Sequence, residues 1–387
     1  MTSRNDKTVR ALNCKAANKS FDVAVIGAGP AGSLTAALVA EAGLSAVILE
    51  QKRLPRSKPC GGFLSARALA LLPKDLILPS ELTEPVHRIR VARRSRTYDY
   101  SAGDNLGLLI KREYFDHLLA RYACHKGAVL IENSTLRRLT EFNGNKESFP
   151  LYRIETDDPK ETPITARYVV GADGAMSRLA LLSGFKESQR GRTGWGLMKY
   201  VQPEGEDEER GLLKFYPLPF LGGMGWSFHG FGWINQGVGG LASRRILKKA
   251  YDRLFPADIK KGGAFPISWP LPFLGPLKIA GRDNLLLVGD AAGLIEPFSG
   301  EGLYNSFKSS ILASKALLLA EREGKPTGEI YNNLYRAYFR KAFAAALVGT
   351  VVLHCRAVIC PSSLPRLIAN LMENKLWFNR GFSSTDG

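Results

Sequence analysis

Six residues near the N-terminus have the types and spacing needed to hold a dinucleotide. Residues 27–32 read Gly-Ala-Gly-Pro-Ala-Gly, which is the pattern G-x-G-x-x-G. The first glycine permits a tight turn, the second lets the backbone approach a diphosphate, and the third lets a helix pack closely on a strand. Free N–H groups and the positive end of the helix dipole would face the phosphates. Contacts to the ligand are therefore expected from Gly27, Gly29, Ala31 and Gly32.

The segments on both sides of this pattern have the character that it requires. Residues 21–26 form an apolar, β-branched run typical of a buried parallel strand. Residues 33–42 have helical character, and residues 45–49 form a second apolar strand that ends in Glu50. An acid at that position accepts hydrogen bonds from the ribose hydroxyls of a dinucleotide. Because strand, turn, helix, strand and acid follow in order, a glycine-rich turn without a ligand is the weaker interpretation.

Two later segments indicate which dinucleotide is bound. Residues 166–174 (ARYVVGADG) and 284–290 (NLLLVGD) are strands that end in Gly-Ala-Asp-Gly and Gly-Asp. Residues 300–303, Gly-Glu-Gly-Leu, then open a long helix. Together with the first glycine pattern, this set resembles the FAD-binding flavoproteins of the p-hydroxybenzoate hydroxylase type. The resemblance implies that FAD is the cofactor and that Asp290 binds its ribityl or diphosphate part.

Further FAD contacts follow from the same resemblance. The helix that begins near Gly302 and Leu303 would direct its N–H groups at the pyrimidine edge of the flavin and favour the anionic reduced form. Arg112 begins an R-x-x-F-D pattern and would contact the FAD phosphates, with a surface arginine on an amphipathic helix as the alternative. Leu136 is at the position where the family supplies a backbone contact to the adenine.

A loop at residues 58–62 narrows the family. It reads Lys-Pro-Cys-Gly-Gly and closely resembles the P-C-G-G loop of geranylgeranyl reductases, which lies beside the flavin ring. Gly61 and Gly62 are therefore expected beside FAD. Cys60 is the candidate catalytic residue, as a proton donor on the substrate side of the flavin. A small buried hydrophobe is the alternative role for this cysteine.

An aromatic segment points to the substrate side of the site. Residues 220–228 (FLGGMGWSF) resemble the aromatic strand Y-x-W-x-F-P of the same family, with Met224 and His229 in place of its Tyr and Pro. Trp226 and Phe228 lie two apart and share one face of a strand. Together with His229 they are expected in the substrate pocket, and plain core packing is the alternative. The segment lacks the W-x-W-x-I-P pattern of flavin halogenases.

These motifs predict an α/β and α+β protein with a Rossmann-like, discontinuous FAD-binding domain. That domain is expected to comprise residues 21–72, 109–184 and 281–322. An inserted substrate domain, built as an antiparallel sheet over the flavin, is expected from residues 81–108 and 190–280. Residues 330–387 are predicted to be a helical C-terminal region, and residues 1–20 a disordered basic leader.

The chain carries an excess of positive charge. Its 53 Lys and Arg residues against 36 acidic residues give a net charge of +17. Such a field attracts anions, among them phosphorylated substrates, an anionic membrane surface or an acidic protein, although simple solubility is an alternative. A nucleic acid is not expected, because the sequence has no recognisable binding motif for one.

The cysteines and the apolar runs of the sequence indicate in which cellular compartment the protein is expected. The 5 cysteines include no C-x-x-C pair, which argues against a disulfide framework or a metal site and favours a reducing, cytoplasmic compartment. The longest apolar run, residues 342–353, is shorter than the ~20 residues of a membrane span. The basic and apolar C-terminal region is instead expected to cover an apolar tunnel or to lie peripherally on a membrane.

The resemblance to geranylgeranyl reductases implies a reaction. The expected function is reduction of carbon–carbon double bonds in an isoprenoid or polyprenyl lipid, with hydride transfer from N5 of reduced flavin. The electron donor stays open between NAD(P)H and a ferredoxin-like protein, because no second G-x-G-x-x-G is present. The alternatives are an FAD-dependent monooxygenase of an apolar or aromatic substrate and a non-catalytic electron-transfer flavoprotein.

Overall fold

The structure is a computed structural model of the chain. It describes residues 20–93, 96–101, 106–142, 150–158, 162–185, 193–203, 205, 208–230, 232–256, 265–272, 275–297, 300–359, 362 and 366. The predicted leader lies outside the described residues except for Ser20, and so does nearly all of the chain beyond residue 359.

Eight strands form the first sheet, whose core is parallel. They are β1 (Ser20–Ile26), β2 (Ala46–Leu49), β8 (Val129–Ile131), β9 (Leu136–Phe142), β10 (Leu151–Thr156), β11 (Ile164–Gly171), β17 (Gly281–Arg282) and β18 (Leu285–Leu287). The order is β17-β18-β11-β1-β2-β8, and the pairs from β18 to β8 are parallel. The last four residues of β1 and all four of β2 are buried, as their apolar sequences require. The two strands predicted around the glycine pattern are thereby confirmed.

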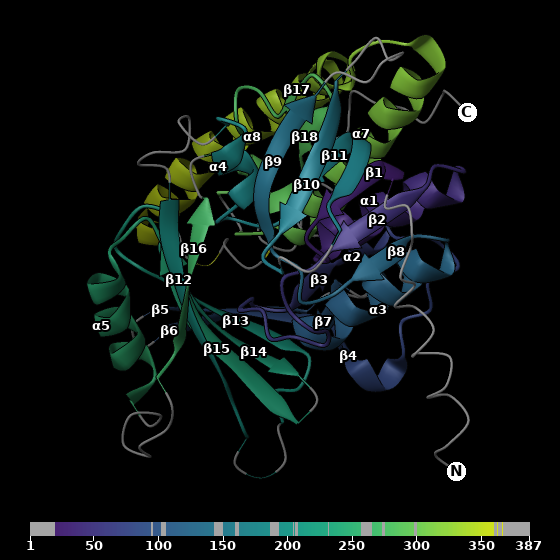
Figure 1. Cartoon of the computed structure of the whole chain (residues 1–387). Coiled ribbons are helices and arrows are strands. Elements are labelled where there is room, and N and C mark those ends of the chain that lie inside the picture. The colour runs from purple at the N-terminus through teal and green to yellow at the C-terminus, as the bar shows by residue number, and fades with distance from the viewer. Residues whose placement is uncertain are drawn as a thin grey trace, which may run out of the picture.

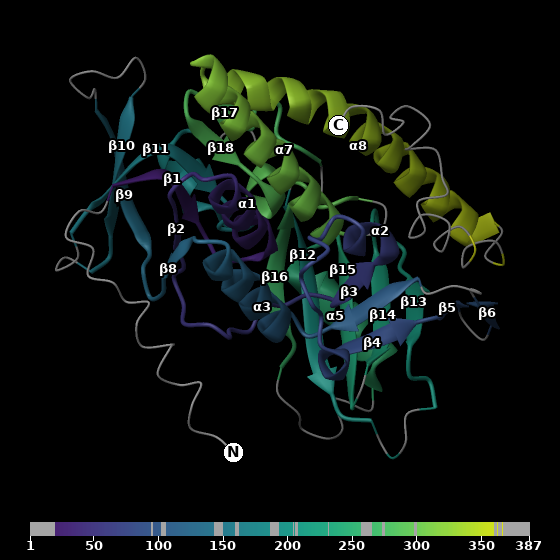
Figure 2. The same cartoon turned by 90° about the vertical axis from the view of Figure 1, so that its right-hand side faces the viewer.

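Helices pack on the sheets and on one another. They are α1 (Pro30–Glu41), α2 (Ala66–Leu69), α3 (Arg112–His125), α4 (Arg178–Leu182), α5 (Arg244–Leu254), α7 (Leu303–Glu323) and α8 (Thr327–Ile359), with short 3-10 helices η2 (Ser80–Leu82) and η4 (Gly289–Ala292). α1 lies between α3 and α7 and packs against both (Figure 2). The small residues along α1 allow this close packing, and most of the helix is buried. α5 packs instead on the second sheet, which is described below.

A second sheet of seven strands lies beside the first (Figure 1). Its strands are β5 (Arg88–Arg93), β6 (Arg96–Ser101), β12 (Thr193–Val201), β13 (Leu212–Pro217), β14 (Met224–Gly230), β15 (Trp233–Gly240) and β16 (Ile267–Pro272). All neighbours are antiparallel except β5 and β13, which pair in parallel. An antiparallel sheet was predicted, and the pair of β5 and β13 departs from that prediction. The difference arises because β5 comes from the earlier segment and is joined to β13 by no hairpin.

A small third sheet connects the two larger ones. It is formed by β3 (Phe63–Ser65), β7 (Gly107–Ile110) and β4 (Thr83–Val86), with β7 in the middle. The observed sheets and helices confirm the predicted mixed α/β class with a helical C-terminal region. The division into an FAD-binding domain and an inserted substrate domain stays a prediction.

The long helix α8 is held to the first sheet by an aromatic stripe. Tyr331, Tyr335, Phe339 and Phe343 follow one another at every fourth position and are all buried. Full burial of each such side chain contributes roughly 1.5–3 kcal/mol to folding. The hydroxyls of Tyr331 and Tyr335 donate hydrogen bonds to the carbonyls of Leu287 (2.9 Å) and Ala292 (3.2 Å). α8 therefore supports the segment that includes β18 and η4.

Figures 1 and 2 show α8 extending past the body of the first sheet. Leu347, Val348 and Val351 are exposed on this part of the helix. No helix in the described part of the chain has the length and apolar character needed to cross a bilayer.

Candidate functional site

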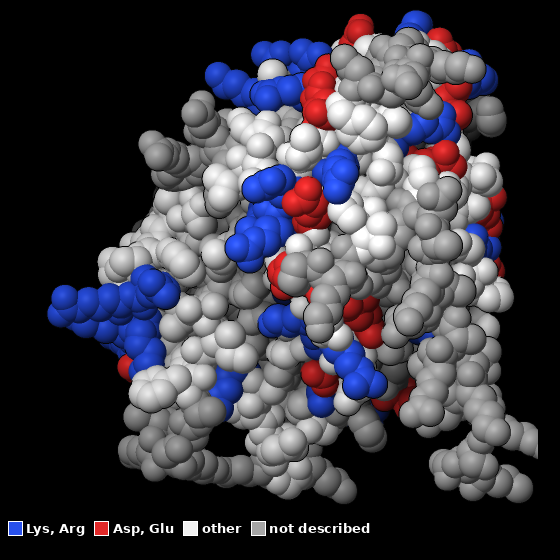
Figure 3. All heavy atoms as spheres, in the orientation of Figure 1, with Lys and Arg blue, Asp and Glu red and all other residues white. Residues whose placement is uncertain are grey.

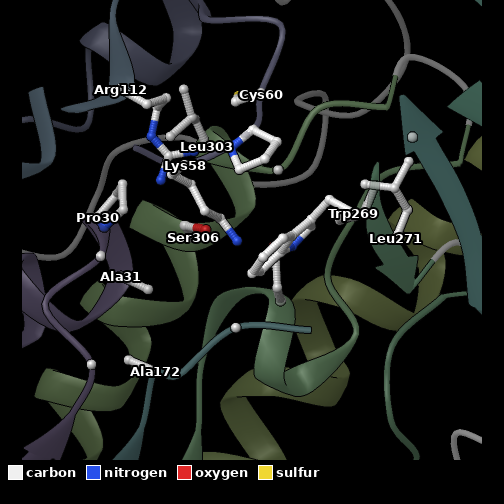
Figure 4. Close-up of a pocket in the computed structure, with 18 of the residues that line it drawn as sticks. Pro30, Ala31, Lys58, Cys60, Arg112, Ala172, Trp269, Leu271, Leu303 and Ser306 are labelled. Atoms are coloured by element: carbon white, nitrogen blue, oxygen red, sulfur yellow. The ribbon is translucent and has the colours of Figure 1, made fainter. Parts of the chain in front are cut away.

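One cavity is lined by residues of both large sheets (Figure 4). Its volume is about 660 Å³, within the usual range for a small-molecule or cofactor site. All the predicted site residues line this cavity except Gly32 and His229. Segments that are far apart in sequence, near Gly27, Arg112 and Asp290, therefore meet at one place.

The turn between β1 and α1 forms one end of the cavity. Gly27 has φ +105°, and a Cβ there would lie 2.6 Å from the Ala172 carbonyl oxygen. A Cβ at Gly32 would lie 1.9 Å from the Gly27 carbonyl oxygen, so Gly32 packs helix against turn and does not face the cavity. A Cβ at Gly29 would meet only the Arg56 guanidinium, at 3.8 Å. Gly29 is therefore the glycine that leaves space for a ligand.

The N-terminus of α1 is open to an anion. Gly29 is the N-cap and supplies no side-chain hydrogen bond, Pro30 follows it, and the first turn contains no acidic residue. Pro30 and Ala31 both lie at the cavity wall (Figure 4). Unpaired N–H groups and the helix dipole favour a phosphate at such a position.

Glu50 ends β2 and is almost completely buried. Its Oε2 accepts a hydrogen bond from the backbone N–H of Ala28 (2.9 Å), and its Oε1 accepts one from that of Lys52 (3.1 Å). Arg56 forms an ion pair with the same carboxylate at 3.1 Å. The carboxylate thus holds the glycine turn in place through the Ala28 N–H. That it also accepts hydrogen bonds from a ribose stays a prediction.

Arg112 is buried at the start of α3 and is not a surface arginine. Its Nε lies 2.7 Å from Oδ1 of Asp116, which also pairs with Arg56 at 3.1 Å. Burial opposes the charge of Arg112, but Asp116 and then Cys60 outweigh it and raise the pKa of the guanidinium. Arg112 therefore stays charged inside the cavity wall, as a phosphate contact requires.

Another part of the cavity wall is formed by the start of α7. Gly302 is the N-cap of this helix without a side-chain cap, and a Cβ there would lie 3.3 Å from Oδ1 of Asp290. Leu303 follows at the cavity surface. A second helix N-terminus and an acidic side chain thus share one part of the cavity. Leu136, at the start of β9, lines a different part, next to Ser134 and Thr135.

The loop with Cys60 is fixed to the second sheet by a buried amide. Asn235, on β15, is fully buried; its Nδ2 donates to the Cys60 carbonyl (2.8 Å), and its Oδ1 accepts from Nε1 of Trp226 (2.8 Å). A Cβ at Gly61 would lie 3.0 Å from the Phe228 ring. The Cys60 thiol accepts a hydrogen bond from the Gly62 N–H at 3.4 Å. Asn235 could not be predicted from the sequence, because an Asn in a strand gives no sign of a distant loop that it contacts.

Trp226 and Phe228 line the cavity from β14, whereas His229 does not. The imidazole of His229 lies 3.1 Å from the Ser227 hydroxyl and 3.5 Å from the Glu209 carboxylate. The reason is the alternation of side chains along a strand, which turns residues 227 and 229 to the face opposite Trp226.

Three buried polar atoms at the cavity have no hydrogen-bond partner within the described part of the chain. They are Oγ of Ser134, Oδ1 of Asp173 and Nε1 of Trp269. Burial raises the pKa of Asp173, against hydrogen bonds from Ser177 and three backbone N–H groups that lower it. Buried polar atoms are nearly always paired, so these three require a ligand or water. A cofactor rich in hydroxyls, ring nitrogens and phosphate oxygens fits them, which makes the cavity suitable for FAD.

Comparisons with known proteins agree with this geometry. Residues 20–206 match a family model described as an FAD binding domain. The chain is 27% identical to conditioned medium factor receptor 1 of Dictyostelium discoideum, over 92% of this chain and 74% of that protein. It is 28% identical to digeranylgeranylglycerophospholipid reductase 2 of Methanopyrus kandleri, over 86% of each chain.

A solved structure has the same fold. It is a geranylgeranyl bacteriochlorophyll reductase-like protein from Thermoplasma acidophilum, with a TM-score of 0.76 and 22% identity, and the match covers 91% of this chain and 92% of the other. The predicted cofactor, FAD, is confirmed. The chain is therefore an FAD-dependent oxidoreductase, and it is similar to the reductases of the geranylgeranyl type in sequence and in fold.

Proposed function

We propose that this protein reduces carbon–carbon double bonds in the isoprenoid chain of a lipid. The observation that carries the proposal is the continuity of the cavity, which joins the glycine turn at Gly29 to an apolar wall from the second sheet. That wall includes the side chains of Met198, Phe215, Met224, Trp226, Phe228 and Leu271. The relative from Methanopyrus kandleri, a digeranylgeranylglycerophospholipid reductase by name, supports the same substrate class.

Different residues of the chain would bind the cofactor and position the substrate. Gly29, Arg112 and the N-terminus of α1 would hold the FAD diphosphate, and Asp290 with the N-terminus of α7 would hold the ribityl and flavin part. Reduced FAD, when bound, supplies a hydride from its N5 atom. The protein would orient the alkene against the flavin and exclude water. Holding the two reactants in place makes the bimolecular step effectively unimolecular and so lowers its barrier.

The apolar wall suits an extended chain. Gly196 and Gly239 contribute no side chain to this wall, and a Cβ at Gly239 would be in ordinary contact with Trp226 (3.5 Å) and Leu271 (3.6 Å). Such a surface gives a flexible hydrocarbon close contact with apolar side chains and rings. It also argues against a flavoprotein that only transfers electrons, which needs no apolar cavity.

The function is tested by anaerobic titration. The purified yellow protein is reduced with dithionite, and candidate polyprenyl lipids are added while the flavin absorbance is followed. We expect reoxidation of the flavin with a saturated product, and none with a saturated lipid of equal length. If every lipid leaves the flavin reduced, while oxygen uptake is coupled to NADPH oxidation on an aromatic compound, the protein is a monooxygenase instead.

Cys60 is the proposed proton donor to the second alkene carbon. Its side chain lies at the cavity and interacts with Arg112, while its carbonyl is held by Asn235. We expect Cys60→Ala to bind FAD normally and to reoxidise about 100-fold more slowly with lipid, in the range for loss of a general acid. Cys60→Ser should recover part of the rate. Unchanged turnover in Cys60→Ala would remove this role.

We propose that the electron donor binds a basic surface on α5. Arg244, Arg245, Lys249 and Arg253 are exposed on α5, where Lys and Arg gather at the left edge of the molecule (Figure 3). This face suits an acidic ferredoxin-like donor, and NAD(P)H is the other candidate. The exposed apolar residues of α8 described above would suit a peripheral position on an anionic membrane, in the cytoplasm.

A further inference from the structure

Lys58 places a positive charge inside the cavity. It comes from the loop between β2 and β3, and Figure 4 shows its side chain extended into the cavity toward Trp269. Its Nζ lies 4.0 Å from the centre of the Trp269 ring. A Cβ at Gly174 would lie 3.7 Å from the same nitrogen. The ammonium group therefore stands where loops of the first sheet meet an edge strand of the second.

The other buried cations of the cavity wall are already neutralised. Each has a carboxylate in contact: Arg56 with Glu50, Arg67 with Glu301, and Arg112 with Asp116. Within the described residues, no carboxylate lies within ion-pair distance of Lys58. Burial lowers the pKa of Lys58, and Asp290 offsets this only in part. A buried charge without a counter-ion is costly, and an anion that enters the cavity removes the cost.

The indole N–H of Trp269, next to Lys58, also has no hydrogen-bond acceptor among the described residues. Nε1 of Trp269 is buried without a hydrogen-bond partner in the described part of the chain. An ammonium and an indole N–H are donors only. The ligand that fills this part of the cavity must therefore present acceptor atoms, and at least one of them should be anionic to match Lys58.

We propose that Lys58 is a phosphate-binding residue inside this cavity. The FAD diphosphate is one source of the phosphate, and the phosphate of a prenyl substrate is the other; only the second source rests on the function proposed above. Lysine binds phosphate as a point charge, so arginine at this position retains most of the interaction if it fits.

Lys58→Met tests the first source. We expect the dissociation constant of FAD to rise about 10- to 100-fold, the usual loss for a hydrogen bond to a charged group. Binding of riboflavin, which has no phosphate, should change less than about twofold, and Lys58→Arg should restore most of the FAD affinity. Affinities are measured with the full-length protein by quenching of flavin fluorescence.

Lys308→Met is the matched control. Lys308 is also partly buried, its Nζ lies 4.6 Å from the centre of the Tyr338 ring, and burial lowers its pKa, but it does not line the cavity. The control should leave the FAD affinity unchanged. Equal weakening of FAD and riboflavin by Lys58→Met would indicate a structural role and would overturn the proposal.

The second source is tested on the reduced holoprotein at saturating FAD. Geranylgeranyl diphosphate and geranylgeraniol are compared as oxidants of the flavin in wild type and Lys58→Met. Loss of a preference for the diphosphate in the variant supports binding of the substrate phosphate. Unchanged FAD affinity together with an unchanged preference contradicts the proposal. If neither compound reoxidises the wild-type flavin, the isoprenoid function fails, and the FAD measurement still decides the role of Lys58.

Discussion

Gly29→Asp is expected to give a folded protein that no longer binds FAD. Gly29 is the N-cap of α1, and its φ of −76° is accessible to any residue. Aspartate is a preferred N-cap, so the helix should be as stable as before or slightly more so. The new carboxylate would extend into the cavity, where a Cβ meets nothing nearer than the Arg56 guanidinium at 3.8 Å. It would therefore stand where the diphosphate of FAD is expected and repel it.

The loss of affinity should be at least about 1000-fold, because like charges in contact cost several kcal/mol. The measurements are flavin absorbance of the purified protein, the dissociation constant of added FAD, and thermal unfolding of the apoprotein. Gly29→Ala is the control, and its effect should be much smaller because it adds volume without charge. A yellow Gly29→Asp protein with wild-type affinity would show that the diphosphate does not lie at this turn.

Gly32→Ala is expected to fail for the opposite reason, by destabilising the fold. The added Cβ would lie 1.9 Å from the carbonyl oxygen of Gly27 and 3.0 Å from Cβ of Ala172. The first contact is with backbone, which cannot rotate away as a flexible side chain does. We expect a loss of about 3 kcal/mol or more in the free energy of unfolding, at the upper end for overpacking.

Urea denaturation of the apoprotein measures this loss as a lower midpoint. Gly29→Ala again serves as the control, since it adds the same methyl group to the same turn without a close contact. The two substitutions thus separate cofactor binding from stability. Gly29→Asp should abolish FAD binding in a stable protein, and Gly32→Ala should lower the stability of the fold. An unchanged midpoint in Gly32→Ala would mean that the turn relaxes to accommodate a methyl group.

The parts of the site that depend on local sequence were predictable. The glycine turn, the strands around it and the acid at residue 50 lie within one short unit, and each element has a local pattern. The cavity also brings Gly27, Arg112 and Asp290 together, although each lies in a separate segment. Their joint use was indicated by the resemblance to the FAD-binding flavoproteins.

The parts that depend on contacts between the sheets were not predictable. Asn235 and Trp269 contribute through their neighbours across the cavity, and neither has a local pattern that shows this. Lys58 belongs to the Lys-Pro-Cys-Gly-Gly loop, but its lack of a carboxylate partner among the described residues is visible only in three dimensions. His229 is a different case, because the two-residue period of a strand already separates it from Trp226 and Phe228.

The hydrogen bonds from α8 to the carbonyls of Leu287 and Ala292 can form only after α8 has been synthesised. The chain is made from its N-terminus, so the glycine turn emerges from the ribosome long before Tyr331 and Tyr335. At roughly 5–20 residues per second, the interval is tens of seconds. During that interval β18 and η4 lack their outer support, and the cavity lacks a firm wall beside Asp290. Firm binding of the cofactor is therefore expected only after α8 has been synthesised, although the glycine turn is translated much earlier.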